Sequence, residues 1–241
     1  GGMLPVFAVY STFLQRGYDQ MIHDIAIQGV KVVLAVDRAG IVGEDGVTHQ
    51  GIFDAAYLNT IPGVSVFSPS YYDELNLCLR EALYRCPGFA AVRYPRGPQL
   101  FRPCDFTLSG RSFDLYGPRE SGIVIVTYGR LFSFACLALT RLKEKGLLAR
   151  VVKLNRINPV DGEAVRSVKG AEKVFFFEEG IRQGGIGEHF GFLLYRSGYS
   201  GKFFLSAIDG FVEHATMAQC LSGLGLDEDG MVRAVLTECG K

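Results

Sequence analysis

Short apolar runs alternate along the chain with longer stretches in which apolar residues recur at helical spacing. Before residue 97 this pattern predicts strands at 6–10, 32–36, 64–67 and 89–93, and helices at 13–28, 53–58 and 69–84. The run 32–36 is short, continuous and β-branched, which indicates a strand buried on both faces.

A second cycle of the same pattern begins after residue 120. It predicts strands at 123–127, 150–154, 173–177 and 203–207, and helices at 131–145, 161–168, 187–196, 213–221 and 228–236. Residues 99–120 interrupt the rhythm with prolines, glycines and mixed polar residues, as a linker does. Strand–helix alternation therefore predicts an α/β protein of two three-layer αβα domains with largely parallel sheets, at 1–98 and 121–241.

The composition is that of a globular protein. Of 241 residues, 48% are hydrophobic and 21% charged, which is enough apolar material for a real core. The formal net charge is zero, so no overall basic field favours nucleic acid or an anionic membrane surface. No apolar run reaches membrane-spanning length. Six cysteines without a Cys-x-x-Cys pair indicate reduced thiols of a cytoplasmic protein.

The loop at 37–51 is the most informative segment for function. It follows the buried run 32–36 and holds four glycines together with Arg38 and His49. In a parallel sheet, ligands gather at the carboxyl ends of strands, where this loop would emerge. Glycines let a ligand approach the backbone, arginine binds anions, and histidine moves protons near neutral pH. The alternative is a surface loop whose charges are only solvated.

Four sequence motifs in the first half of the chain resemble those of a known enzyme family. They are YSTFLQR at 10–16, DRAG at 37–40, DGVTHQG at 45–51 and RYPRG at 93–97. In combination they closely resemble the 1-deoxy-D-xylulose-5-phosphate synthases, which are thiamine-diphosphate-dependent and transketolase-like. Weaker words follow at 184–187 and 224–227, so the likeness covers nearly the whole chain.

The resemblance implies what the intact enzyme does. Such a synthase condenses pyruvate with glyceraldehyde 3-phosphate, with loss of CO2, for isoprenoid, thiamine and pyridoxal biosynthesis. It uses thiamine diphosphate and Mg2+, and a homodimer in the bacterial cytoplasm or a plant plastid is implied. The domain at 1–98 would be a truncated pyrimidine-binding domain, and 121–241 the transketolase C-terminal domain.

Two expected features of such a synthase are absent from this sequence. They are the Gly-Asp-Gly word that holds magnesium and diphosphate, and the catalytic glutamate shortly before a Gly-Gly that corresponds to residues 1–2. We therefore expect this chain to be the C-terminal portion of the enzyme, inactive alone and dependent on the N-terminal region. It would neither bind the cofactor tightly nor turn over pyruvate.

The resemblance also implies roles for particular residues. Phe13 would stack on the cofactor's aminopyrimidine and Arg16 would line the same pocket. Without the family, Phe13 could equally be a core residue and Arg16 a surface one. His49 would be the catalytic group that hydrogen-bonds the substrate and reaction intermediate, as a general acid or base can.

The remaining candidates concern the phosphorylated acceptor. Tyr10, Arg38 and Arg96 resemble the family's phosphate clamp, and the fork of an arginine suits phosphate better than the point charge of lysine. Asp45 matches a residue near the acceptor substrate. The Glu44–Asp45 pair lacks the ligand count and spacing of a calcium loop, so no metal site is predicted.

A dinucleotide-like pattern in the second half is interpreted differently. The glycines at 184 and 187 follow the apolar run 175–177 and imitate a nucleotide fingerprint. Glu178 and Glu179 stand where a pyrophosphate would arrive and would repel it. The glycines are expected to let strand and helix pack closely.

Two other functions remain open from the sequence. One is a pyruvate-dehydrogenase-type β subunit that partners a separate α chain. Such a subunit would retain the upstream glutamate, and the two arginines favour a phosphorylated acceptor. The other is a non-catalytic module of the same fold.

Overall fold

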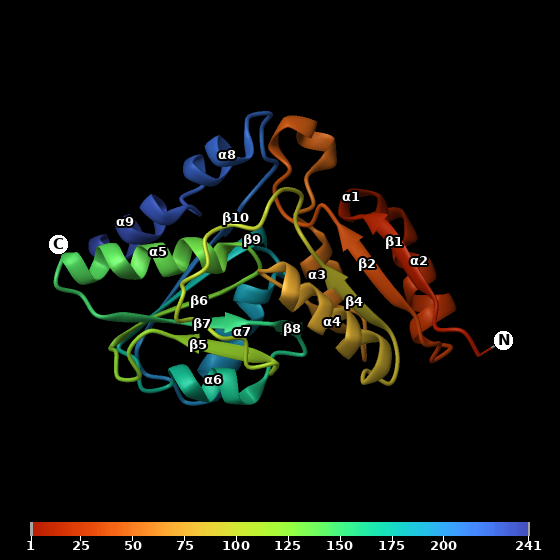
Figure 1. The fold of residues 1–241 in the computed structure, drawn as a ribbon, viewed down its shortest axis with the longest axis horizontal. Helices are drawn as coiled ribbons and strands as arrows, with labels where there is room; N and C mark the ends of the chain where they lie inside the picture. Colours follow the sequence, from red (N-terminus) through yellow and green to blue (C-terminus); the bar gives the residue numbers. More distant parts are fainter. Residues whose placement is uncertain (1, 241) are drawn as a thin grey trace.

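The chain folds around two five-stranded sheets. Figure 1 shows the first half of the chain packed beside the second. The computed structural model describes residues 2–240. The strands are β1 (Val6–Tyr10), β2 (Val33–Asp37), β3 (Ser65–Phe67), β4 (Ala90–Arg93), β5 (Phe113–Tyr116), β6 (Ile123–Tyr128), β7 (Ala149–Leu154), β8 (Arg156–Asn158), β9 (Lys173–Ile181) and β10 (Lys202–Ile208).

Helices alternate with the strands in both halves of the chain. The α-helices are α1 (Ser11–Leu14), α2 (Tyr18–Gln20), α3 (Asp54–Asn59), α4 (Tyr72–Tyr84), α5 (Leu131–Glu144), α6 (Gly162–Val168), α7 (Ile186–Arg196), α8 (Met217–Gly223) and α9 (Glu228–Glu238). Single turns of 3-10 helix lie at η1 (Gln15–Gly17), η3 (Gly43–Asp45) and η4 (Val47–His49), and η2 (Met21–Ala26) is a π-helix.

The first sheet has the order β1-β2-β4-β3-β8. Its first four strands run parallel, and successive residues of β2 face opposite layers. Val33 packs in one apolar cluster with Cys78 and Ala82 of α4, whereas Leu34 packs in another with Leu14 of α1 and Ala55 of α3. Burial on both faces confirms the prediction made from the run 32–36.

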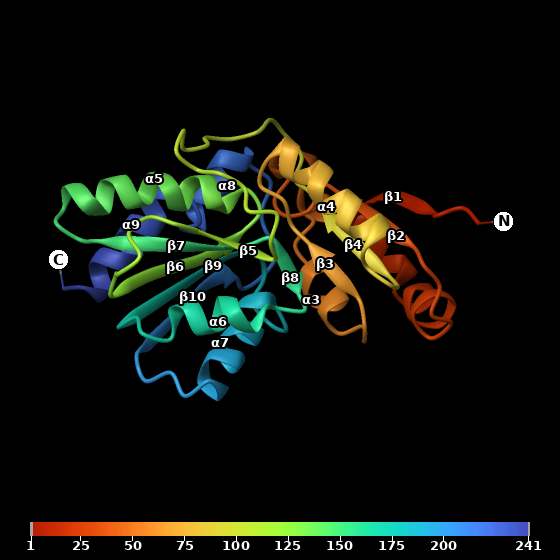
Figure 2. The ribbon, with the colours of Figure 1, turned by 60° about the horizontal axis from the view of Figure 1, so that its bottom comes forward.

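The second sheet has the order β10-β9-β6-β7-β5, in which only β5 is antiparallel to its neighbour. Helices α5 and α9 lie on one face, and α6 and α7 on the other, as Figure 2 shows. Alternate residues of β9 follow this division, since Phe175 packs toward the α5 and α9 side and Phe176 toward α7. The predicted pair of three-layer α/β units is confirmed.

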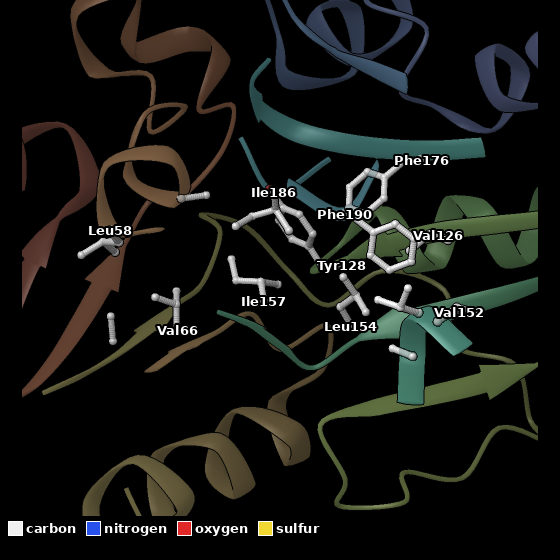
Figure 3. Packing of buried hydrophobic residues seen from close by; sticks show 14 of the residues in the cluster. Leu58, Val66, Val126, Tyr128, Val152, Leu154, Ile157, Phe176, Ile186 and Phe190 are labelled. Atoms are coloured by element: carbon white, nitrogen blue, oxygen red, sulfur yellow. The ribbon is translucent and has the colours of Figure 1, made fainter. Parts of the chain in front are cut away.

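The two sheets are joined by a shared core. Strand β8 follows β7 of the second sheet but pairs with β3 of the first sheet, in antiparallel register. The fully buried Ile157 of β8 lies in a cluster that runs from Leu58 and Val66 to Phe176 and Phe190 (Figure 3). Continuous close packing of this kind fixes one half of the chain against the other.

Some elements differ from the sequence-based expectations. The helix expected at 13–28 is divided into α1, η1, α2 and η2, and it ends before Gly29, which has φ 64°. Helix α8 begins at Met217 rather than near residue 213, because Thr216 and Gln219 form a capping box there.

The segment expected to be a linker contributes β5, which pairs with β7 along its whole length. β5, with four residues, and β8, with three, are too short to give a periodic signal. The division of the chain into domains at 98 and 121 stays a prediction. No helix within residues 2–240 is long and apolar enough to cross a membrane.

Candidate active site

Parallel pairing brings the ends of three strands to one edge of the first sheet. Tyr10 at the end of β1 is in register with Asp37 at the end of β2, and Val36 is in register with Arg93 of β4. Beyond the strands, the Ala39 amide donates to the Tyr94 carbonyl at 3.0 Å. The segments that follow β1, β2 and β4 therefore lie side by side.

Arg38 has the only positive φ of any non-glycine residue in the described chain, at 57°. This conformation is unusual for a residue with a side chain and is often found at functional sites. The Asp37 carboxylate accepts from the Arg38 amide and from its Nη1, both at 2.7 Å. The guanidinium lies 3.7 Å from the centre of the Tyr10 ring, a cation–π contact.

The Arg38 Nε is buried and has no hydrogen-bond partner within the described part of the chain. A buried N–H without a partner costs free energy unless a ligand or water satisfies it. Ser11 Oγ, Ser133 Oγ and Arg150 Nε are buried without a partner in the same way, so a role of the Arg38 donor in binding an anion stays a prediction.

Asp45 connects Arg38 with Arg96. Its Oδ1 lies 2.6 Å from the Arg96 Nη1, and its Oδ2 lies 3.9 Å from the Arg38 Nε. This hydrogen bond and the negative charge of Asp45 raise the pKa of the Arg96 guanidinium above its usual value. One carboxylate thus contacts both guanidinium groups, which lie close enough together to share an anion.

His49 and Phe13 form an aromatic group next to these charges. The Phe13 ring stacks on Tyr10 with centroids 5.6 Å apart and meets the edge of His49 at the same distance. Thr48 Oγ1 lies 3.0 Å from His49 Nδ1, and the Thr48 carbonyl accepts from Thr12 Oγ1. The histidine ring is therefore held from one side. Its Nε2 makes no hydrogen bond to any residue between 2 and 240.

The loop that carries Arg38, Asp45 and His49 is closed at its base by two glycines. Gly40 and Gly51 exchange backbone hydrogen bonds of 2.6 and 2.8 Å. A Cβ at Gly51 would lie 2.1 Å from the Arg38 carbonyl oxygen, and one at Gly40 would lie 2.5 Å from the Glu179 carboxyl group. The loop approaches other backbone and side chains more closely than any larger residue permits.

Of the seven predicted site residues, the structure brings six together: Tyr10, Phe13, Arg38, Asp45, His49 and Arg96. Arg16 lies in η1, exposed, without a polar partner in the described chain, and its place in the pocket stays a prediction. The functional roles of all seven also stay predictions.

Sequence reasoning missed three residues that support this cluster. They are Asp37, which binds Arg38, and the buried pair of Arg130 and Glu179, which contacts the loop at Ile41. Asp37 is adjacent to Arg38 in the sequence and could have been found there. Arg130 carries no local signal, because its contacts are distant along the chain.

The adjacent glutamates 178 and 179 bind different parts of the chain: Glu179 accepts a hydrogen bond from the loop at Ile41, and Glu178 accepts from the start of α7. Glu178 accepts from the amides of Ile186 and Gly187 at 2.9 and 2.8 Å, so its carboxylate fills the N-terminus of α7. Burial raises the pKa of Glu178. A Cβ at Gly187 would lie 2.3 Å from Leu205, which agrees with the close packing expected there. Gly184 has φ 71° and nothing within 4 Å of an added Cβ, so the expectation of close packing is wrong for that glycine, which serves a turn instead.

Comparisons with known proteins agree with this geometry. Residues 1–99 match the transketolase pyrimidine-binding domain, and residues 118–231 match the transketolase C-terminal domain. The chain is 41% identical over 238 residues to 1-deoxy-D-xylulose-5-phosphate synthase of Pseudomonas paraeruginosa, covering 97% of this chain and 37% of that protein. The chain belongs to the 1-deoxy-D-xylulose-5-phosphate synthase family. This is a family of thiamine-diphosphate-dependent transferases.

Other relatives extend the comparison. The synthase of Pelotomaculum thermopropionicum is 40% identical over 243 residues, covering 98% of this chain and 38% of that protein. The chain thus spans little more than a third of these synthases. Among solved structures, an inactive β4 tetramer of a split-gene transketolase has a TM-score of 0.83 at 24% identity over 98% of this chain and 76% of that one. Transketolase of Campylobacter jejuni has a TM-score of 0.79 at 19% identity over 98% of this chain and 36% of that one. Both show the fold alone.

The family's cofactor can be tested against these residues in two parts. Phe13 is 43% exposed, so it still offers aromatic surface to a flat pyrimidine ring. No group of three acidic, histidine or cysteine side chains within residues 2–240 could hold a metal ion. The exposed Phe13 ring has the chemistry to pack on the pyrimidine end of the cofactor, and this role stays a prediction. The described residues offer no site for magnesium.

Gly51→Ala tests whether the glycine contact sets the shape of the loop. The new Cβ would collide with the Arg38 carbonyl, so we expect a loss of about 1–3 kcal/mol in unfolding free energy, as for other overpacked sites. Hydrogen exchange at Gly40 and Ile41 should also accelerate. The control is Gly88→Ala, where nothing lies within 4 Å of the added Cβ. Unchanged exchange at Gly40 in Gly51→Ala would show that the loop is held elsewhere.

Proposed function

We propose that the protein acts as a 1-deoxy-D-xylulose-5-phosphate synthase, joining pyruvate to glyceraldehyde 3-phosphate with loss of CO2. The activity belongs to the intact enzyme, in which this chain would form the acceptor site and the pyrimidine pocket. The observation that carries the proposal is the pair of guanidinium groups of Arg38 and Arg96, joined by Asp45 beside His49. Support also comes from the similarity to synthases over almost the whole chain.

In this proposal the acceptor's phosphate binds between Arg38 and Arg96. The unpartnered Arg38 Nε donates to one phosphate oxygen, and the Arg96 side chain, 45% exposed, turns toward another. Charge-assisted hydrogen bonds of this kind are stronger than neutral ones. Because Asp45 now contacts both arginines, its carboxylate must move aside when a phosphate dianion arrives, since like charges repel.

The aldehyde end of the acceptor would then lie toward His49. Thiamine diphosphate, when bound, supplies the carbon nucleophile made from pyruvate. His49 Nε2 hydrogen-bonds the reacting oxygen and transfers a proton to it, while Thr48 holds the opposite nitrogen of the ring. Phe13 contributes an aromatic surface that packs against the pyrimidine and helps to exclude water.

No observation specifically favours either alternative, the pyruvate-dehydrogenase-type β subunit or the non-catalytic module. A β subunit acting on an unphosphorylated acceptor has no use for two arginines at adjacent strand ends. A non-catalytic module has no use for two guanidinium groups that contact one carboxylate beside an exposed aromatic ring and His49.

His49→Ala in the intact enzyme should lower turnover by ~10²-fold or more, because a positioned acid–base group is lost. The fold should survive, since His49 lies in a polar loop outside the apolar clusters. The control is His23→Ala, whose side chain is 62% exposed and pairs with no described residue other than Asp19. Steady-state kinetics with pyruvate and glyceraldehyde 3-phosphate measures both. Wild-type turnover in His49→Ala would remove His49 from the reacting centre.

Arg38→Ala and Arg96→Ala separate a phosphate site from a structural role. A hydrogen-bonded charge contributes about 1.5–3 kcal/mol, so each variant should lose ~10–150-fold in kcat/KM for glyceraldehyde 3-phosphate. The loss should be much smaller with unphosphorylated D-glyceraldehyde, which offers the arginines no dianion. The KM for pyruvate should change less.

The control for this pair is Arg85→Ala, whose guanidinium is 77% exposed and binds Glu81 far along the chain from the loop. It should leave both acceptors unaffected. Equal losses for the two acceptors in Arg38→Ala and Arg96→Ala would mean that these arginines only hold the loop, and the phosphate assignment would fail.

A further inference from the structure

Arg130 and Glu179 form a buried ion pair in the second half of the chain. Arg130 follows β6 as the N-cap of α5, and Glu179 lies near the end of β9. Their side chains are 4% and 7% exposed, and the Arg130 Nε lies 2.8 Å from Glu179 Oε2. An ion pair removed from water in this way is costly unless its other polar atoms are also satisfied.

The remaining polar atoms of Arg130 and Glu179 find hydrogen-bond partners in the loop at 37–51. Glu179 Oε1 accepts from the Ile41 amide at 2.6 Å, and the Arg130 Nη2 donates to the Ile41 carbonyl. The pair therefore holds both backbone polar groups of one residue. Ile41 itself is fully buried and lies three residues beyond Arg38.

The same guanidinium also reaches the segment after β4. The Arg130 Nη1 donates to the Arg96 carbonyl at 3.3 Å and lies against the sulfur of Met217. One side chain thus binds the backbone of the loop that carries Arg38 and the backbone of Arg96. Arg130 makes no hydrogen bond to the guanidinium group of Arg38 or of Arg96 within the described residues, so it acts on the backbone that carries them.

Glycine at position 40 makes this contact possible. Gly40 has φ 86°, and a Cβ there would lie 2.5 Å from the Glu179 carboxyl group. The backbone at Gly40 therefore lies so close to the Glu179 carboxyl group that a larger residue at position 40 would collide with it. The backbone segments that carry the two arginines of the site are both bonded to this residue pair from the other half of the chain.

We propose that Arg130 and Glu179 are positioning residues that set the distance between Arg38 and Arg96, and so determine recognition of a phosphorylated acceptor. This inference rests on the proposed function. Arginine is required at position 130, because its planar fork serves Glu179, Ile41 and Arg96 at once, whereas a lysine offers one ammonium group.

The test uses Arg130→Lys and Glu179→Gln in the intact enzyme. A small displacement of binding groups lowers efficiency strongly, so KM for glyceraldehyde 3-phosphate should rise roughly 10-fold. We expect kcat at saturation to stay within about threefold, because His49 and its threonine contacts are untouched. The KM for D-glyceraldehyde should change little. A purely structural pair would lower the melting temperature without this difference between acceptors.

Two further variants keep the test decisive if those proteins fold poorly. Gly40→Ala reaches the same contact from the loop side and should give the same selective rise in KM. Arg141→Lys is the control, because Arg141 lies on the same helix α5 but pairs with Glu228 and Asp229. It should change neither acceptor.

Hydrogen exchange of this 241-residue chain gives a readout independent of activity. The Ile41 amide should exchange faster in Glu179→Gln, while amides of β6 stay protected. Unchanged Ile41 exchange, or equal KM changes for both acceptors, would overturn the proposal.

Arg38→Ala and Arg96→Ala, measured beside these variants, distinguish failure of the positioning role from failure of the proposed function. If they discriminate between the acceptors and the Arg130 and Glu179 variants do not, the positioning role fails and the proposed function stands. If they fail to discriminate, the proposed function fails, and the positioning role fails with it.

Discussion

The site depends on the burial of β2 between β1 and β4. Val33 and Val36 are fully buried, and they have partners on both faces of the sheet, so the strand cannot shift without exposing apolar surface. A one-residue slip would move each side chain of β2 to the opposite face. The register of β2 with its two parallel neighbours therefore places Tyr10, Arg38 and the segment before Arg96 at one edge. The contacts of Arg38 with Tyr10 and with Asp37 follow from this placement.

Charge is balanced within the site before any ligand binds. Asp37 and Asp45 face Arg38 and Arg96, so the cluster carries two charges of each sign. Asp37 binds Arg38 through its backbone amide as well as its side chain, which supports the left-handed backbone there. Asp45 lies in η3, where it contacts the buried Arg38 Nε at 3.9 Å and the Arg96 side chain, 45% exposed, at 2.6 Å. The two carboxylates thus differ: Asp37 supports the conformation of the loop, and under the proposed function Asp45 gives way to an anion.

The sequence predicted those parts of the structure whose causes are local. The run 32–36 predicted a buried strand because its residues are apolar and contiguous, and the structure confirms that strand. The glycines, Arg38 and His49 of the following loop indicated a ligand site at the end of the strand, and this site stays a prediction. The short β8 was missed, since a three-residue strand has no measurable periodicity. The helix after β1 was expected to be continuous, but the apolar spacing does not reveal its π-helical turn at Met21–Ala26.

The anchoring of the loop could not have been predicted from local pattern. Arg130 lies 89 residues from Ile41, and Glu179 lies 138 residues from it. Their juxtaposition depends on the shared core around Ile157, where the two sheets pack together. Adjacent glutamates at 178 and 179 were visible in the sequence, but only the fold shows that they face a helix end and a loop.

The central claim is that Arg38 and Arg96 form one anion site in which Asp45 occupies the place of a ligand. A crystal structure of this chain with inorganic phosphate tests it most directly. The account predicts a phosphate bonded to the Arg38 Nε and to the Arg96 guanidinium, with the Asp45 carboxylate displaced from its 2.6 Å contact. A phosphate bound elsewhere, with Asp45 still between the two arginines and the Arg38 Nε still without a partner, would contradict it.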